Sequence, residues 1–305
     1  MKSFVSFLSC FYFFFGFSQS EPFTIKNISL NSDKPHFGLS FIPNNQVLFT
    51  SYLLNKNGKV KSYLSDGILT LYVGNKAESG DIINVESLLI DSKEDISHIT
   101  SAFISPDGKS LYVTTNYINR KNKPKGNFKK TNFHIEIAEY VEGQGWTNFK
   151  AVPFCKPQYS YAHPSLSPDG KTLFFTANIR GGKEMAKGPS DIFKVEVLGN
   201  NTYSEPKNLG SQVNSYSTEM FPFMSYNNIL YFASNRANGV GGFDIYKSEM
   251  NEKGIFEKAK ALPQPINSKS DDLCFVIDKT GKSGYFSSKR EEGKGEDDIY
   301  YFTVD

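Results

Sequence analysis

Three of the four histidines in this sequence come into register with carboxylates when the chain is aligned on a recurring turn. Seven residues before the second position of that turn stand His36, Ile99, Tyr161, Glu219 and Asp272, and one position earlier stand His98 and Asp271. His163 follows two residues after Tyr161. Histidine beside carboxylates can transfer protons or bind divalent metal ions. The candidate site is therefore His36, His98, Tyr161, His163, Glu219, Asp271 and Asp272.

This candidate ring leaves three interpretations open. It is a binding mouth for a ligand or partner, a metal or acid–base centre, or a set of acids that hydrogen-bond neighbouring strands. No His-x-x-x-His spacing supports a metal, so we predict no metal site and no cofactor. Glu219 with Asp271 or Asp272 is the best pair for glycoside hydrolysis, which needs two carboxyls about 5–10 Å apart. The absence of a Gly-x-Ser-x-Gly motif argues against a serine nucleophile, and we assign no catalytic residue.

Two other polar sets repeat or cluster. Asp191, Asp244 and Asp298 recur once per unit, which is typical of a structural hydrogen bond and not of an active site. Residues 117–131 form a basic loop without acidic residues, which includes Arg120, Lys121, Lys123 and Lys125. A solvated hairpin is the plain interpretation of such a run, and an anionic partner or membrane surface is the alternative.

The elements that position these residues are repeated. Ser-Pro-Asp-Gly-Lys at 105–109 and at 167–171 each precedes a strand-like run, and weaker copies begin at residues 42, 225 and 278. Proline presets φ, aspartate caps the backbone and glycine adopts positive φ, so the phrase predicts a tight turn. Five copies spaced 53 to 63 residues apart indicate one small β unit repeated in a ring. We expect the face that carries these turns to be inert.

The units share one internal order of four short strand-like runs; in the fourth unit they span residues 219–225, 229–235, 243–249 and 256–262. The last unit lacks a fourth run, whereas residues 23–32 match the fourth-strand exit of the third unit, at 207–215. The sequence thus predicts an all-β fold, a single β-propeller of five four-stranded blades closed by the N-terminal strand. The expected blades are about 35–97, 98–157, 158–214, 215–268, and 269–305 plus 22–30. A sixth blade within the longer first or second unit is the alternative.

The first 18 residues are typical of a secretory signal peptide, with Lys2 before an apolar run at residues 4–17. Fourteen residues are too few to cross a bilayer comfortably, so a retained anchor is only the alternative, and nothing comparable follows. The propeller domain is then residues 19–305. Its near-neutral charge, together with export, argues against a nucleic-acid partner. Cys155 and Cys274 are expected to be buried free thiols, on an outer and an inner strand of blades too far apart to pair.

At this point the residues resemble a known family. Glu219, Pro222, Ser225, Asn235-Arg236 and Asp244-Ile245-Tyr246 follow the TolB-type (WD40-like) propeller repeat of bacterial envelope proteins, and the style of the repeats is similar to exported proteins of the Bacteroidota. The first two units depart from it, with Gly67 and His134 near the Asp position. TolB itself has six blades and a further domain, and many relatives carry an OmpA-like peptidoglycan-binding domain. This chain shows neither, so Tol-system docking and peptidoglycan anchoring are not implied.

The resemblance implies an exported, non-enzymatic scaffold, in the periplasm, associated with the outer membrane or secreted. We expect it to bind envelope proteins, or a glycan, through the face of the histidine–carboxylate ring, as a monomer or part of a complex. The alternative is a secreted carbohydrate hydrolase or lyase that uses the carboxylates of that ring. Fold alone does not decide between them, because propellers host both classes.

Overall fold

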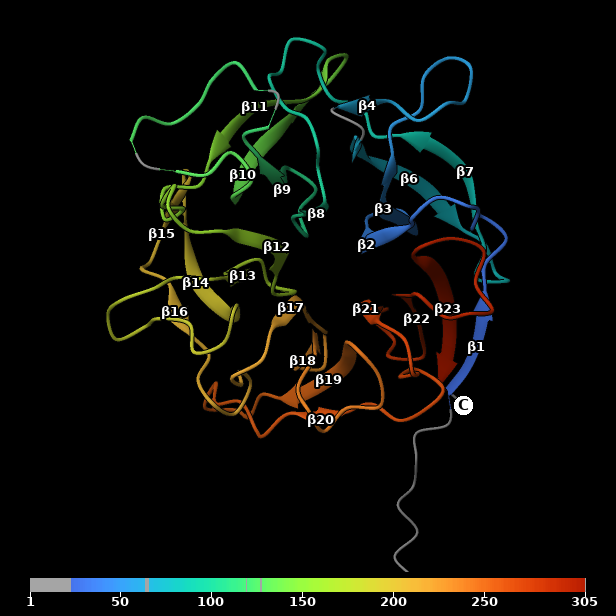
Figure 1. Cartoon of the computed structure of the whole chain (residues 1–305), viewed down its shortest axis with the longest axis vertical. Coiled ribbons are helices and arrows are strands. Elements are labelled where there is room, and N and C mark those ends of the chain that lie inside the picture. The colour runs from blue at the N-terminus through green and yellow to red at the C-terminus, as the bar shows by residue number, and fades with distance from the viewer. Residues whose placement is uncertain (1–22, 64–65, 119, 127, 305) are drawn as a thin grey trace, which may run out of the picture.

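The computed structural model describes residues 23–63, 66–118, 120–126 and 128–304. In these residues it contains strands and no helix, and five antiparallel sheets stand in a ring around a central axis (Figure 1). The predicted five-bladed β-propeller is therefore confirmed. The proposed signal peptide lies outside the described residues, and within them no helix is long and apolar enough to cross a membrane.

Each blade is an antiparallel sheet whose first strand lies nearest the axis. Blade one contains β2 (Phe37–Ile42), β3 (Gln46–Tyr52), β6 (Leu69–Lys76) and β7 (Ile82–Ser87), with a small hairpin of β4 (Ser62–Tyr63) and β5 (Asp66–Gly67). Blade two contains β8 (Ser101–Ile104), β9 (Ser110–Asn116), β10 (Phe133–Val141) and β11 (Gly145–Ala151). Blade three contains β12 (Tyr161–Leu166), β13 (Thr172–Ala177), β14 (Asp191–Gly199), β15 (Thr202–Tyr203) and β16 (Lys207–Asn208).

The last two blades follow the same order. Blade four contains β17 (Glu219–Met224), β18 (Ile229–Ser234), β19 (Asp244–Glu249) and β20 (Lys260–Ala261). Blade five contains β21 (Asp272–Ile277), β22 (Ser283–Ser288), β23 (Asp298–Val304) and, as its outer strand, β1 (Phe23–Asn27) from the beginning of the described chain. The ring is thus closed by a composite blade, as the sequence predicts.

The repeated phrase forms the turn between the first and second strands. In blade two the Asp107 carboxylate accepts hydrogen bonds from the Ser105 hydroxyl at 2.5 Å and the Lys109 amide at 3.1 Å. Gly108 has φ of 73°, a conformation that costs glycine little, and its amide donates to the Ser105 carbonyl at 2.8 Å. These contacts are local, which explains why the turn can be recognised from sequence.

A side-chain clasp reinforces the closing strand. The register runs from Phe23 opposite Val304 to Asn27 opposite Tyr300. Asn31, just beyond β1, accepts from the Ile299 amide at 2.9 Å and donates to the Ile299 carbonyl at 2.7 Å. In blades three and four the same clasp is made by Asn214 on Ile192 and by Asn267 on Ile245. The N-terminal segment therefore occupies the fourth-strand position.

Two expectations need correction. The fourth strand of blade four is much shorter than predicted, because the Ala259 amide donates to the Gln212 carbonyl of the preceding blade and interrupts pairing with β19. Both cysteines are free, and Cys274 is buried on β21. Cys155, however, is only partly buried and lies after the end of β11, so it is not on an outer strand.

The core lies between the blades and is strongly aromatic. The largest fully buried side chains include Phe49, Phe175, Phe232, Phe275 and Phe286. Four of these rings lie on the second strands of blades one, three, four and five and pack in clusters shared with a neighbouring blade, and burial of each aromatic side chain contributes about 2–3 kcal/mol. This apolar packing holds the ring rigid enough to fix the loops on its two faces.

Candidate functional site

The two faces of the ring carry different connections. The turns between first and second strands lie on one face, which we call the turn face. The loops between second and third strands, and the connections that lead into the next blade, lie on the other, the loop face. The predicted histidine–carboxylate ring belongs to the loop-face end of the inner strands.

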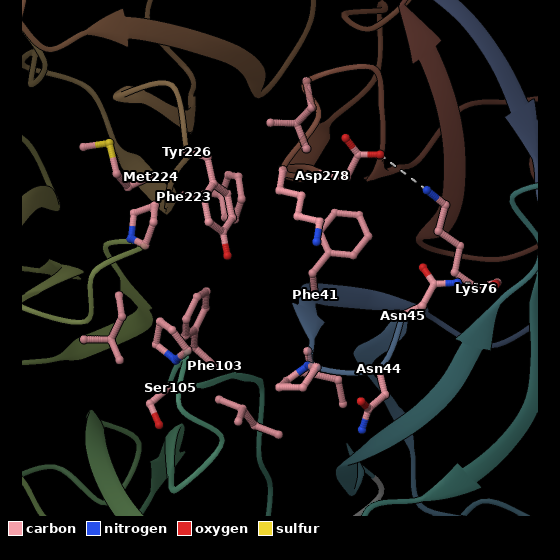
Figure 2. A pocket seen from close by; sticks show the side chains of 18 of the residues that line it. Phe41, Asn44, Asn45, Lys76, Phe103, Ser105, Phe223, Met224, Tyr226 and Asp278 are labelled. Atoms are coloured by element: carbon pink, nitrogen blue, oxygen red, sulfur yellow. Dashed lines mark hydrogen bonds and ion pairs between the residues drawn. The ribbon is translucent and has the colours of Figure 1, made fainter.

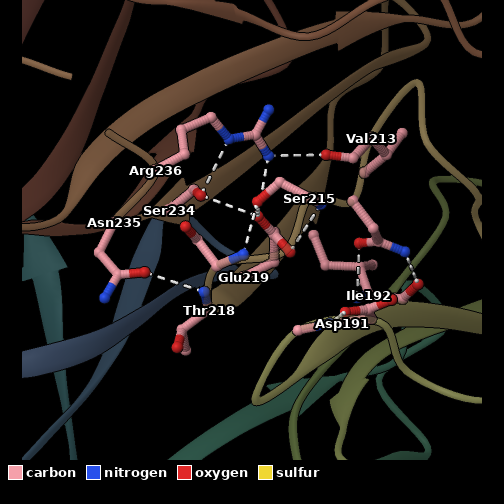
Figure 3. Close-up of polar contacts among 12 residues, drawn as sticks. Asp191, Ile192, Val213, Ser215, Thr218, Glu219, Ser234, Asn235 and Arg236 are labelled. Carbon is pink, nitrogen blue, oxygen red and sulfur yellow. Dashed lines mark hydrogen bonds and ion pairs between the residues drawn. The ribbon is translucent and has the colours of Figure 1, made fainter. Parts of the chain in front are cut away.

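Glu219, the central carboxylate of the predicted ring, is fully buried and completely hydrogen-bonded (Figure 3). One oxygen accepts from the hydroxyls of Ser215 and Ser234, at 2.5 and 2.8 Å, and from Arg236 Nη2 at 2.9 Å. The other accepts from the Ser215 amide at 3.1 Å. Arg236 also donates to the Val213 carbonyl at 2.7 Å, at the exit of blade three. Glu219 and Arg236 therefore fasten one blade to the next.

Asp272 repeats this arrangement in blade five. It is fully buried, and its oxygens accept from the Ser288 hydroxyl at 2.6 Å, Arg290 Nη2 at 3.0 Å and the Ser268 amide at 2.6 Å. Arg290 continues to the Ile266 carbonyl at the exit of blade four. Burial raises the pKa of Asp272, although Ser288 and Arg290 oppose the shift. All four oxygens of Glu219 and Asp272 are thus occupied by the protein itself.

The remaining acids of the ring are also bound to backbone. Asp271 accepts from the Phe243 amide at 2.9 Å. Among the in-register acids, Asp191 accepts from the amides of Lys187 and Gly188, and Asp244 from those of Val240 and Gly241. The expected structural role of this repeated aspartate is confirmed by these contacts, which fold the loop-face loop back onto its own blade.

The histidines and Tyr161 do not converge on one centre. Tyr161 is buried in the core against Phe154 and Phe175, so it does not line the mouth that the sequence predicts. Burial lowers the pKa of His36 and of His98. His163 lies deeper, inside the channel, where its ring stacks on Phe221 at 3.7 Å and burial lowers its pKa to about 3.

The described residues contain no group of three or more His, Cys, Asp or Glu side chains placed to hold a metal ion. One loop-face acid nevertheless stands out. Asp297 is only 9% exposed, and its Oδ1 atom has no hydrogen-bond partner. Burial raises its pKa to about 6; the nearby carboxylates of Glu296, Asp271 and Asp298 add to the rise, and Lys289 opposes it. The flanking acids Glu296 and Asp298 are visible in the sequence, but the burial of Asp297 and its proximity to Asp271 are not.

The basic loop differs from the expectation at its first residue. Arg120 is not a free surface cation: its guanidinium pairs with the buried Glu136 at 2.7 Å, and Glu136 also contacts His134 Nε2 at 2.7 Å. Lys121, Lys123 and Lys125 are exposed, as a solvated loop predicts. Arg120 is therefore an internal brace of this loop and does not belong to its charged surface.

A cavity opens on the turn face, which was expected to be inert. It encloses about 500 Å³, within the range of ligand sites (Figure 2). Side chains from all five blades line it. Each blade contributes the apolar residue that stands two positions before the second residue of its turn: Phe41, Ile104, Leu166, Met224 and Ile277. The aromatic rings of Phe103, Phe223 and Tyr226 add to this apolar wall.

Polar groups stand at the edge of this turn-face cavity. Asn44 and Asn45 form the turn of blade one, with φ of 65° and 58°. Lys76 pairs with Asp278 at 3.5 Å and donates to the Ser283 hydroxyl at 2.8 Å, while Lys279 is exposed at the rim. An apolar chamber with a few polar groups at its opening fits an apolar group whose far end remains in water.

The channel is almost closed between the two faces. One residue of each blade meets at the narrowest part: Gly38, Ser101, His163, Phe221 and Cys274. The space there is about 30 Å³, room for a few water molecules at most. Gly38 has φ of 65°, and a Cβ on it would lie 3.0 Å from the backbone carbonyl oxygen of Thr100, so the backbones of blades one and two approach closely there. A much smaller space thus lies between the turn-face cavity and the loop-face acids.

The turn-face cavity was not predicted from the sequence, because most of its lining residues are apolar and carry no catalytic or metal-binding group. The alignment of the five turns does contain a sign of this cavity, because the residue two positions before the second residue of the turn is apolar in all five units. Successive side chains along a strand point to opposite faces. An apolar residue at the same position before the turn in every copy therefore indicates one shared apolar surface. Polar residues at aligned positions of a repeat are easily recognised in a sequence, whereas apolar residues at aligned positions are usually assigned to the core.

Comparisons with known proteins support the fold. No family model matches the chain, and no curated protein matches its sequence. Among solved structures, the chain is similar to an alpha-L-arabinofuranosidase from Lactobacillus brevis, with a TM-score of 0.52, 11% identity and coverage of 90% of each chain. It is also similar to a putative TolB from Agrobacterium tumefaciens, with a TM-score of 0.48, 12% identity, and coverage of 92% of this chain and 90% of that one.

A puromycin hydrolase mutant is similar over 85% of this chain at 13% identity, with a TM-score of 0.44. This chain spans only 35% of that protein. The matched proteins therefore include enzymes and a TolB-type propeller. At these identities the likeness shows the β-propeller fold alone.

Proposed function

We propose that this protein is an exported, non-enzymatic β-propeller of the bacterial cell envelope that binds an apolar segment of a partner protein in its turn-face cavity. The observation that carries the proposal is the mostly apolar cavity of about 500 Å³, lined by all five blades. Binding through this face replaces the earlier expectation that the opposite, loop face binds the partner.

The chemistry of the two faces supports binding over catalysis. Glu219 and Asp272 use every carboxylate oxygen to fasten blades, so neither is free to transfer a proton or attack a substrate. A ligand in the turn-face cavity is separated from them by the narrow part of the channel. Apolar and aromatic anchors in a desolvated pocket are the usual source of binding energy at protein interfaces.

Export and an envelope location rest on the sequence. Their support is the apolar run at residues 4–17 after Lys2 and the resemblance of the repeats to TolB-type propellers. An exported scaffold without a catalytic centre would act by holding a partner, and a rigid ring with a preformed cavity loses little entropy when it does so.

The test removes one anchor from each face. Tyr226, which lines the turn-face cavity, is 58% exposed, and Tyr216, on the connection between blades three and four, is 86% exposed. A photo-crosslinking residue near the cavity, at Lys279, should capture a defined envelope protein. Tyr226→Ala should weaken the binding of that purified partner about tenfold, whereas Tyr216→Ala should not change it. Equal effects of the two variants, or none, would contradict the proposed site.

A carbohydrate hydrolase remains the second candidate, and Asp297 is the observation that favours it. A buried carboxyl with a pKa of about 6 suits a general acid, and the Asp271 carboxylate is close enough to raise that pKa. Release of nitrophenol from aryl glycosides, abolished by both Asp297→Asn and Asp271→Asn, would support this candidate. If no glycoside of a broad panel releases nitrophenol, the hydrolase candidate is contradicted and binding is the function that stands.

A further inference from the structure

The loop face carries a one-sided concentration of positive charge. The loop of blade two between β9 and β10 presents five exposed lysines: Lys121, Lys123, Lys125, Lys129 and Lys130. Within the part of the chain that the structure describes, no carboxylate pairs with any of their ammonium groups. A single loop thus offers five unneutralised charges to solvent.

The loops of the two neighbouring blades extend this charge. Blade one contributes exposed Lys56, Lys59 and Lys61 from the segment between β3 and β6, and blade three contributes exposed Lys183 and Lys187 from the segment between β13 and β14. These loops leave adjacent blades on the same side of the ring (Figure 1). We call the ten lysines of the three loops the basic arc.

The loops of the basic arc are braced by hydrogen bonds to their own backbone. In blade two, the Asp95 carboxylate accepts from the amides of Lys121 and Asn122, next to the buried Arg120–Glu136 pair. In blade three, Arg180 donates to the carbonyls of Ala186, Gly188 and Pro189. The backbone of the blade-two and blade-three loops is therefore held in place at one rim.

The other two blades lack this feature. The corresponding loop of blade four, residues 235–243, contains no lysine, and its Arg236 is tied to Glu219. In blade five the loop carries exposed Glu291, Glu292 and Glu296 against Lys289 and Lys294. The charge is thus separated across the loop face, which would orient the molecule in an electric field.

Apolar side chains stand among the lysines. Leu54 is 37% exposed and Tyr63 is 39% exposed in blade one, and Met185 is 48% exposed in blade three. Basic residues interspersed with exposed apolar and aromatic tips suit a bilayer with anionic headgroups, because lysines approach the phosphates while apolar tips enter the interface. A soluble polyanion would use the lysines but leave the apolar tips in water.

From this arrangement we infer that the basic arc docks the protein, through blades one to three, on the surface of a membrane that contains anionic lipid. Docking in this orientation points the turn face away from the bilayer. The turn-face cavity then stays accessible, so the inference goes beyond the proposed partner site and does not depend on it.

The test is sedimentation of the purified protein with vesicles of phosphatidylcholine, with and without phosphatidylglycerol, over a range of salt. We expect binding only to the anionic vesicles, and weaker binding as salt rises. The triple variant Lys121→Gln, Lys123→Gln and Lys125→Gln should reduce partitioning about 100-fold at low salt, since each lysine near the surface is worth about fivefold.

The matched control changes the same charge on the opposite face. Lys109, Lys171 and Lys282 are exposed on the turn face, and their triple change to glutamine should leave vesicle binding within about twofold of the unmodified protein. Thermal unfolding of both variants should match the parent, because none of these side chains is buried. Tyr63→Ser with Met185→Ser should weaken the binding that persists at high salt.

Three results would overturn the inference. They are no binding to anionic vesicles at low salt, equal losses in the two triple variants, and binding of inorganic polyphosphate without binding of vesicles. The last result would assign the basic arc to a soluble polyanion instead of a membrane.

Discussion

Asp297 offers a prediction whose sign and size both follow from the structure. Its carboxyl is 9% exposed and lacks a partner at Oδ1, and its pKa rises from the ordinary 3.8 to about 6, chiefly through burial. Asp297→Asn keeps the shape of the side chain and removes the charge. We expect the variant to be more stable than the parent near pH 7 and equally stable near pH 4.

The magnitude follows from proton linkage. Between about pH 4 and pH 6 the folded protein holds a proton on Asp297 that the unfolded chain has released. The contribution of this group to the free energy of unfolding is therefore present below pH 3.8 and is lost as pH rises through 6. One pKa unit corresponds to about 1.4 kcal/mol, so a difference of about 2 units gives about 3 kcal/mol. This is the upper limit of the gain in the free energy of unfolding of Asp297→Asn at neutral pH.

The assay is urea unfolding of both proteins at several pH values, with the midpoint and slope measured separately. Asp81→Asn is a control with the opposite sign, because Lys26 and the Ser29 amide hold the pKa of Asp81 well below its usual range. That variant should lose stability at neutral pH and approach the parent in acid. A gain in Asp297→Asn that is independent of pH would refute the electrostatic reasoning, and so would a loss at neutral pH.

Three further predictions concern closure, blade fastening and thiols. Asn31→Ala should lower the free energy of unfolding by about 1–3 kcal/mol in urea titrations, because the buried Ile299 amide loses its partner and the Ile299 carbonyl keeps only the Ile28 amide at 3.3 Å. Arg236→Ala should cost about 3–5 kcal/mol, because it leaves Glu219 charged and unpaired, while Arg236→Met with Glu219→Gln should restore part of that loss in the same titration. Reductant should not change the melting temperature, and Cys274 should resist thiol reagents near pH 8 until the protein unfolds, because burial raises its pKa to about 12.

Most of the fold could be predicted from sequence because its determinants are local. The Ser105–Asp107 turn and the Asn31 clasp depend on residues close in sequence or on a pattern repeated along it, so alignment of the copies reveals them. The length of the fourth strand in blade four could not be predicted, because it depends on a hydrogen bond from Ala259 to the neighbouring blade. Such a contact between blades does not recur at a fixed spacing in the sequence, so alignment of the copies does not reveal it.

The candidate site was harder to predict because residue type does not reveal a residue's partners. Glu219 and Asp272 have the chemistry of catalytic acids, yet each is neutralised by an arginine 17 or 18 residues further along. Arg120 belongs to a run of surface cations in sequence, but a glutamate on the following strand draws it inward. The partner of Arg120 is on the next strand of the same blade, and Arg236 and Arg290 lie just beyond the end of the next strand, so only the register of the sheet shows these contacts.

The arginine clasps also distinguish the loop-face loops of blades four and five from those of blades one to three. In blades four and five, Arg236 and Arg290 run from an inner-strand acid to a carbonyl of the preceding blade, so the start of the loop after the second strand is used to join blades. Blades one to three have no such acid–arginine clasp among the described residues, and their loops carry the basic arc instead. Loops released from joining blades are free to meet a partner. If the basic arc binds a membrane surface, introduction of an acid–arginine clasp into blade three should stabilise the ring. Vesicle binding should then depend on the loops of blades one and two.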